Sequence, residues 1–400
     1  MSSRLPLLVV LSIAMIDAMG IGLILPVMPD LIQEVSGSSL ADAAIWGGIL
    51  TTAFAVMQFL FGPVIGNISD RFGRRPVMLI ALVVMALDYV VMALADTMWL
   101  LLVGRIVGGI TAATFSTIMA YMADVSKGDD KAMRFGYVHA AFGIGFVIGP
   151  AFGGMLAEFG TRTPFVVAAV LASTTALVGF FVLTESLPET LRRPFDWKRA
   201  NPFGAFRAIG RLPGVALLLL TYFFYEVAMI VYSVIWPYYG TELFDWSPRM
   251  IGVSLAIYGG FYAFAQAFLV KPAIRLLGDR RVVVLGLCGE FIFLVYFGFA
   301  SNATLVLLAI PIVATASVGF PALQAILSRR VADDAQGELQ GVLASLVSLA
   351  TIVTPLVMTL VFARFSGPEA GLYAPGAPFL LSACFMVVGI LVFLRSRRRV

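Results

Sequence analysis

Long apolar runs separated by short polar segments fill almost the whole chain. Each run is about 20 residues or longer, the length that an α-helix needs to cross the hydrocarbon core of a bilayer. The pattern predicts twelve spans, near 5–31, 44–68, 76–95, 98–124, 134–158, 164–183, 214–240, 248–270, 282–300, 303–328, 336–362 and 376–395. We therefore expect an all-α integral membrane protein.

Composition supports this fold class and excludes several others. The chain is 60% hydrophobic and only 12% charged, whereas soluble domains are about half apolar and a quarter charged. Cys288 and Cys384 both lie in apolar runs, which argues against a disulfide framework. No metal-ligand spacing is present, and the single histidine, His139, is expected at a solvated span end. The first run contains Asp17 and lacks a cleavage pattern, so we interpret it as a retained span.

The positive charges are distributed unevenly between the two sides of the predicted membrane. Most of the 27 Lys and Arg residues fall on the side that holds both termini. The other side has only Arg162, Arg249 and Arg364, and Arg105 lies within a span. Because cytoplasmic loops collect Lys and Arg, both termini are predicted to be cytoplasmic, in a bacterial inner (plasma) membrane.

An internal repeat divides the chain into two halves. The longest polar stretch, 184–213, follows the sixth span and reads as a cytoplasmic linker between six-helix bundles at 1–183 and 214–400. A constant offset of 205 relates Phe115 to Phe320, Gly136 to Gly341, Pro150 to Pro355, and Gly73 to Gly278. Two parallel repeats of this kind can rock about a central site, as transporters do. A channel needs no such duplication.

The loop between spans two and three, Gly66 to Pro76, is rich in charge and glycine. Its basic residues, Arg71, Arg74 and Arg75, have one simple interpretation as orientation anchors. Asp70 does nothing for orientation, so we expect a clasp that gates a conformational change. In this clasp Asp70 faces a helix N-terminus of the other half, and Arg74 pairs with Asp124. Gly66 and Gly73 would permit close approach and a tight turn.

Span five carries glycines at every fourth position, with a proline directly after the second of them. Gly145, Gly149 and Gly153 form one smooth face for close helix packing, and Pro150 adds a bend. Plain packing is the alternative to a hinge that takes part in gating.

These segments resemble a known family. The loop from Gly66 is similar to the signature between spans two and three of the major facilitator superfamily, and the span-five run is similar to that of its antiporters. Leu102–Gly109 resembles the span-four motif. Three further segments resemble the 12-span tetracycline-efflux group of drug:proton antiporters: Ile16–Pro29, Ala86–Tyr89 and Phe320–Gln324. The resemblance implies the superfamily fold, two pseudo-symmetric bundles, and drug:proton antiport.

Five ionisable residues lie well inside predicted spans, where a charge costs about 2.5–3.5 kcal/mol or more. They are Asp17, Asp88, Arg105, Glu226 and Glu290. One interpretation is a structural ion pair, such as Asp17 with Arg105. The other is proton coupling, in which a proton and a cationic or metal-chelated substrate compete for the same carboxylate. The resemblance implies acids matching Asp17, Asp88 and Glu290, whereas Glu226 stands where the tetracycline group tends to have an amide.

Amides and aromatic residues inside spans are candidate substrate ligands, because an unsatisfied amide in hydrocarbon is costly and aromatic rings can stack on a ligand. With 32 Phe in the chain, helix packing is the alternative for any one ring. Tyr262 stands about where familiar tetracycline exporters place a histidine. The candidates are Gln58, Tyr222, Trp236, Tyr258, Tyr262, Gln266 and Gln324.

Together these features predict proton-coupled efflux of an amphipathic small molecule, tetracycline-like or otherwise polycyclic, by alternating access. We expect no catalytic residue and no cofactor, with protons as coupling ion and a divalent cation entering only as a substrate chelate. The expected partners are substrate, protons and lipid, without nucleic acid, for a chain that works as a monomer. A sugar, amino-acid or siderophore exporter remains open. A polytopic enzyme is less favoured, because no polar catalytic cluster is visible.

Overall fold

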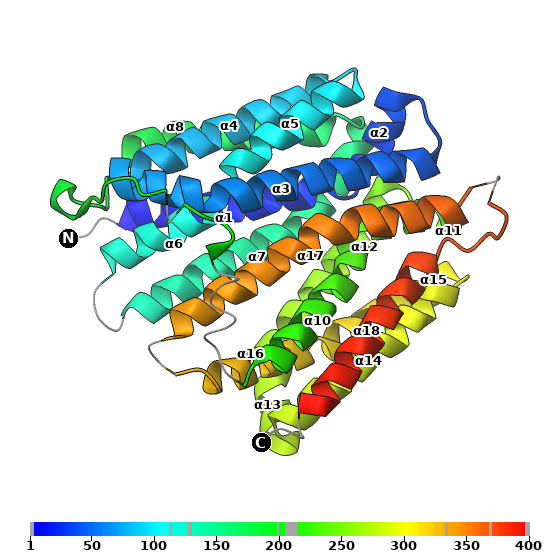
Figure 1. The fold of residues 1–400 in the computed structure, drawn as a ribbon. Helices are drawn as coiled ribbons and strands as arrows, with labels where there is room; N and C mark the ends of the chain where they lie inside the picture. Colours follow the sequence, from blue (N-terminus) through cyan, green and yellow to red (C-terminus); the bar gives the residue numbers. More distant parts are fainter. Residues whose placement is uncertain are drawn as a thin grey trace. The chain divides into compact units, whose positions relative to one another are not determined.

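The computed structural model describes residues 4–112, 114–126, 130–197, 200–204, 214–332, 335–367 and 370–396, and within these ranges every regular element is a helix (Figure 1). Parts of the predicted linker, 198–199 and 205–213, lie outside the described residues. In the part of the chain that the structure describes, twelve helical segments are long and apolar enough to cross a membrane, so the predicted number of spans and the all-α membrane fold are confirmed. A helix satisfies its own backbone groups, as hydrocarbon requires.

The first half of the chain contains the helices α1 to α8. Their bounds are α1 (Arg4–Ile24), α2 (Met28–Ser36), α3 (Leu40–Phe72), α4 (Arg74–Leu94), α5 (Met98–Thr111), α6 (Thr114–Val125), α7 (Asp130–Leu156), η1 (Ala157–Phe159) and α8 (Thr163–Val182). The short helix η2 (Glu189–Leu191) lies in the predicted linker.

The second half contains the helices from α10 onward. Their bounds are α10 (Ala216–Val234), α11 (Trp236–Phe244), α12 (Pro248–Phe264), the π-helical turn η4 (Ala265–Leu269), α13 (Val270–Leu277), α14 (Asp279–Phe299), α15 (Ala303–Ala316), α16 (Gly319–Arg329), α17 (Gln336–Phe365) and α18 (Ala377–Arg395).

Two predicted spans are interrupted where the sequence places proline. The predicted span 5–31 is helical only to Ile24, and α2 begins at Met28, next to Pro29. The predicted span 214–240 divides at Ile235, and Pro237 lies in the first turn of α11. Proline has no backbone N–H and blocks the preceding turn of a helix, so it is favoured at a helix start. Membrane helices also accommodate proline in their interior, as α3, α7, α15 and α17 do.

The chain packs as two compact units, which are described separately. One unit contains Met1–Gly37, Ala53–Pro202 and Pro248–Val253, and the other contains Ser38–Thr52, Phe203–Ser247 and Ser254–Val400. The units thus differ from simple sequence halves, because α3 and α12 each contribute residues to both. The division predicted from the sequence, with a linker at 184–213, remains a prediction.

Close backbone contacts explain why the first part of α3 belongs to the second unit. A Cβ added at Gly47 would lie 2.1 Å from the hydroxyl of Tyr238, and one at Gly48 would lie 2.1 Å from the hydroxyl of Thr359 in α17. Thr52 donates a hydrogen bond to the backbone carbonyl of Ile352 at 3.1 Å. Small residues let helices approach closely in membranes.

The internal repeat is also visible in the helix starts. Thr97 caps α5 by accepting a hydrogen bond from the N–H of Leu100 at 3.3 Å, and Asn302 caps α15 by accepting one from Leu305 at 3.1 Å. The two caps are separated by the same offset of 205 (302−97) that the sequence showed. Equivalent positions in the two halves therefore carry the same capping chemistry.

Candidate functional site

Two of the five predicted intramembrane charges form a direct ion pair. Arg105 in α5 donates a hydrogen bond to Asp88 in α4, and its guanidinium lies over the ring of Phe54, 5.4 Å from the centroid. Both charged side chains are largely buried, with 12% exposure for Arg105 and 5% for Asp88. The sequence had offered Asp17 as the example of an Arg105 partner, and the structure pairs Arg105 with Asp88 instead. The pair offsets the cost of each buried charge.

Tyr89 connects this pair electrostatically to Asp17. The charges of Arg105, Asp17 and Asp88 all act on the buried Tyr89 side chain. A Cβ added at Gly20 of α1 would lie 1.8 Å from the Tyr89 hydroxyl, so glycine gives that hydroxyl its room. The sequence reasoning quoted Tyr89 within a motif but did not name it as a site residue. Its position beside Asp88, in an otherwise apolar helix, was the available signal.

Glu290 and Glu226 both act electrostatically on the same tyrosines in the second unit. Glu290 in α14 is 1% exposed, and neither of its carboxylate oxygens accepts a hydrogen bond from a described residue. The Glu290 charge acts electrostatically on four tyrosines, and the charge of Glu226 in α10 acts on two of the same four. The four are Tyr225, Tyr232, Tyr258 and Tyr262. We call these two acids and four tyrosines the acidic tyrosine cluster.

The predicted ligands Tyr222, Tyr258, Tyr262 and Gln324 lie in or beside this cluster. The Tyr222 side chain is within hydrogen-bonding reach of both Glu226 and Gln324. Tyr258 and Tyr262 are stacked, with ring centroids 6.0 Å apart. Gln324 is exposed, so the polar groups beside Tyr222 reach the accessible surface of the protein.

The other predicted ligands have different surroundings. Trp236 is 4% exposed, and its indole N–H donates to Ser254 at 2.9 Å, with Phe297 edge-on at 5.3 Å. These contacts place Trp236 in a packed aromatic core. Gln58 is exposed in α3 and donates to the carbonyl of Ala112 at 3.4 Å. Gln266 lies in the π-helical turn η4, and its amide nitrogen finds no partner among the described residues.

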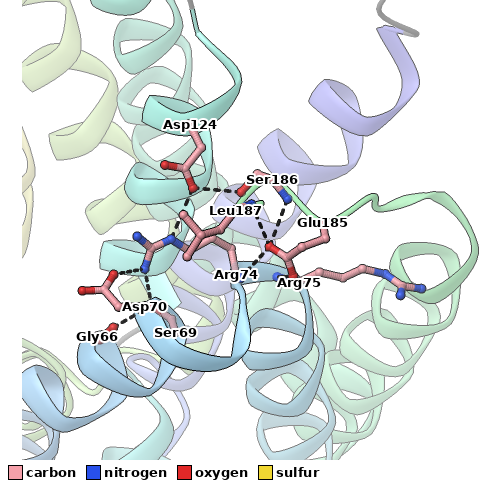
Figure 2. A network of polar contacts seen from close by, with 9 residues as sticks. All are labelled: Gly66, Ser69, Asp70, Arg74, Arg75, Asp124, Glu185, Ser186 and Leu187. Atoms are coloured by element: carbon pink, nitrogen blue, oxygen red, sulfur yellow. Dashed lines mark hydrogen bonds and ion pairs between the residues drawn. The ribbon is translucent and has the colours of Figure 1, made fainter. Parts of the chain in front are cut away.

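Arg74 is the centre of the charged network at the α3–α4 turn (Figure 2). Its guanidinium contacts Asp70 at 2.6 Å, Ser69 at 2.6 Å and Asp124 at 3.3 Å. Ser186 donates a second hydrogen bond to Asp124 at 3.0 Å. The expected pairing of Arg74 with Asp124 is present, and Asp70 joins the same guanidinium.

Glu185 completes this network and was not singled out from the sequence. Its carboxylate accepts hydrogen bonds from the backbone N–H groups of Arg74 at 2.8 Å and Arg75 at 3.2 Å, at the start of α4 (Figure 2). It also accepts from Ser186 and Leu187, each at 3.0 Å. The N–H groups of Arg74 and Arg75 have no partner within α4 itself, and a negative charge is favourable at such a helix N-terminus. The sequence carried no signal for this cap, because the donors are backbone N–H groups.

The glycines of the loop have different surroundings. Gly73 has φ 105°, and an added Cβ would lie 2.2 Å from a carboxylate oxygen of Glu185. Gly73 is therefore required both by its backbone conformation and by the approach of that carboxylate. A Cβ at Gly66 would meet nothing within 4 Å. Arg71 lies over the ring of Phe72 at 5.0 Å.

The glycine stripe of α7 packs directly on α1. Cβ atoms added at Gly145, Gly149 and Gly153 would lie 2.1, 2.6 and 2.3 Å from the carbonyl oxygens of Met15, Met19 and Leu23. Pro150 lies within α7, and its ring occupies the position next to Gly22. The contacting residues recur at every fourth position in both helices, so the two backbones are in contact along the whole stripe. The gating role predicted for these glycines remains a prediction.

The second half repeats the Arg74–Asp124 contact with its charges exchanged. Asp279 at the start of α14 pairs with Arg329 at the end of α16. Both positions are offset by 205 from the first-half pair (279−74 and 329−124). In each unit an ion pair joins two helix ends. The basic residue lies at the helix start in the first unit, and the acidic residue lies at the helix start in the second.

The fold and the placement of charges define a class of protein. Twelve apolar helices, an internal repeat and ionisable side chains within spans are the features of a secondary membrane transporter. The chain belongs to the Major Facilitator Superfamily, whose family model matches residues 10–231 and 218–400.

Curated relatives are similar over most of their length. Tetracycline resistance protein, class C, of Escherichia coli is 40% identical over 93% of this chain and 93% of its own. Tetracycline resistance protein, class G, of Vibrio anguillarum is 36% identical over 91% and 92%. Among solved structures, a bacterial homologue of the human lysosomal transporter Spinster has a TM-score of 0.81 at 18% identity, covering 100% of this chain and 98% of its own. The last comparison shows the shared fold.

Proposed function

We propose that this protein exports an amphipathic small molecule, tetracycline-like or otherwise polycyclic, in exchange for protons by alternating access. The observation that carries the proposal is Glu290, a carboxylate at membrane depth that accepts no hydrogen bond from the described residues. A buried charge without a partner is costly, so a proton or a cationic substrate group would stabilise this position. The similarity to tetracycline resistance proteins supports efflux as the direction.

In this proposal the pair of Asp88 and Arg105 responds to protonation. A proton on Asp88 removes the charge that Arg105 contacts, so the pair loosens, and loss of the proton restores it. The charges of Asp17, Asp88 and Arg105 all act on Tyr89, so protonation of Asp88 would change the electrostatic potential at Tyr89. The first unit thus has a proton-sensitive contact between α4 and α5, and the second has Glu290 and Glu226.

The proposal includes a location and an orientation. The protein would lie in a bacterial inner membrane with both termini in the cytoplasm, because the Lys- and Arg-rich loops fall on the side of the termini. One polypeptide already carries both repeats, so the monomer is the proposed working unit. No resident cofactor is invoked.

Proteoliposomes with an acidic lumen test the proposal. Tetracycline should accumulate in the lumen as protons leave, and dissipation of the pH gradient should abolish accumulation. Glu290→Gln should lose this coupled accumulation, whereas Glu189→Gln, at an exposed glutamate in η2, should retain it. A panel with a sugar, an amino acid and a siderophore distinguishes the other exporter classes. Gradient-driven transport that is unchanged in Glu290→Gln would refute the assignment of the coupling acid.

A further inference from the structure

Glu226 is a carboxylate at membrane depth that has no cationic partner among the described residues. It lies near the middle of α10, which spans Ala216–Val234. Asp88 has Arg105 as its partner, whereas no described Lys or Arg side chain forms an ion pair with Glu226. A carboxylate inside a span usually faces an interior pathway or a ligand rather than lipid. The position therefore has negative charge available for a cation.

A stacked aromatic surface lies next to this carboxylate. The ring of Phe320 in α16 is stacked on Tyr225 at a centroid distance of 4.7 Å and an interplanar angle of 18°, and on Tyr222 at 5.4 Å and 29°. Tyr222 is within hydrogen-bonding reach of Glu226. Aromatic faces attract organic cations, and the attraction grows when water is excluded. Tyr222 and Tyr225 are buried, whereas Phe320 is partly exposed, so the acid and the Phe320 ring offer charge and apolar area together.

The two acids of the acidic tyrosine cluster differ in accessibility. Glu290 is 1% exposed, whereas Glu226 is partly exposed and Gln324, beside Tyr222, is exposed. A ligand arriving at the accessible surface therefore meets Glu226 first. The more buried Glu290 is better suited to a proton, which needs no volume.

We propose that Glu226 is a specificity-determining residue that binds the positively charged group of an organic cation, with the flat part of the ligand packing against the partly exposed ring of Phe320. Stacking on the buried rings of Tyr222 and Tyr225 holds the Phe320 ring in place. The inference rests on the proposed function and deepens it, because it names aromatic monovalent cations as a substrate class. No group of three or more His, Cys, Asp or Glu side chains that could hold a metal ion is found among the described residues. A single carboxylate beside rings matches an organic cation better than a bare divalent metal.

Ethidium binding to the purified full-length protein in detergent tests this inference. Ethidium is a fluorescent aromatic cation, and phenanthridine, the parent of its ring system, is uncharged at neutral pH and serves as the competitor. Glu226→Gln should weaken ethidium binding on the order of ten-fold, which corresponds to about 1.4 kcal/mol. It should leave the phenanthridine affinity unchanged. Glu226→Asp, which keeps the charge, should retain most of the affinity, and Glu189→Gln should match the unmodified protein.

Two outcomes would overturn the inference. One is equal ethidium affinity of Glu226→Gln and the unmodified protein. The other is an equal loss of ethidium and phenanthridine binding, which would mean that Glu226 maintains the aromatic surface rather than contacting the charge. Proton-driven tetracycline accumulation is measured after the same protein samples are reconstituted into proteoliposomes. If the unmodified protein accumulates tetracycline but Glu226→Gln binds ethidium as tightly as the unmodified protein, only this inference fails. If the unmodified protein shows no proton-driven accumulation, the proposed function fails.

Discussion

Removal of the Glu185 carboxylate should destabilise the start of α4 and release the adjacent linker. Glu185 accepts four backbone hydrogen bonds, including those from Arg74 and Arg75 in the first turn of the helix. Loss of an N-cap costs about 0.5–2 kcal/mol, and loss of a negative charge at a helix N-terminus costs about 0.3–1 kcal/mol. Because Glu185 is only half-buried, we expect about 1–2 kcal/mol for Glu185→Ala and about half of that for Glu185→Gln.

Two measurements report the global and the local effect of this substitution. Equilibrium unfolding in mixed detergent micelles gives the change in free energy of unfolding. Limited digestion with trypsin, which can cleave after Arg192 in the same segment, reports local opening. The backbone N–H of Arg193 donates to the carbonyl of Asp70 at 3.1 Å, so release of the segment would also break that contact. Glu185→Ala should therefore be cleaved faster.

Glu189→Ala is the matched control. Its side chain is 88% exposed and lies 3.7 Å from Arg192, a distance at which a surface ion pair contributes little. If Glu185→Ala and Glu189→Ala show the same stability and the same rate of cleavage, the carboxylate does not cap α4 and the reasoning is wrong.

Three further substitutions test contacts in both units. Gly149→Ala would place a Cβ 2.6 Å from an α1 carbonyl oxygen and should destabilise the protein by about 1–3 kcal/mol. The control is Gly143→Ala on the same helix, where an added Cβ meets nothing within 4 Å and should be neutral. Equal unfolding curves for the two variants would contradict the close contact. Arg105→Gln leaves a buried carboxylate without its cation and should cost about 3–5 kcal/mol in unfolding measurements, with Arg105→Lys intermediate. Asp279→Arg and Arg329→Asp should each reduce thermal stability, and the double exchange should restore it unless the pair contributes nothing.

The ion pair between Arg105 and Asp88 could have been predicted from the sequence, although Asp17 was named as the example of a partner. The turn between α4 and α5 covers 95–97, so Asp88 lies seven residues before it (95−88) and Arg105 eight residues after it (105−97). Two helices of one hairpin place such positions at nearly equal depth. Charge matching along a predicted hairpin would therefore have favoured Asp88 over Asp17.

The cap formed by Glu185 and the core position of Trp236 were not available from the sequence. The donors that Glu185 binds are backbone N–H groups of a distant segment, which have no sequence signature. Trp236 is an aromatic residue inside a span like the tyrosines of the acidic tyrosine cluster, and periodicity does not separate them. Only the packing of Trp236 against Phe297 and its hydrogen bond to Ser254 place it in the core.

The sequence alone determined that the chain crosses a membrane twelve times as helices, because hydrocarbon leaves the backbone no other way to satisfy its hydrogen bonds. It also determined the repeat, since the offset of 205 is a property of the chain itself. Tertiary structure decided which charges meet, which glycines contact another backbone, and which aromatic rings lie beside Glu226. These depend on side chains that approach one another from separate helices, at distances of a few ångströms that linear order does not encode.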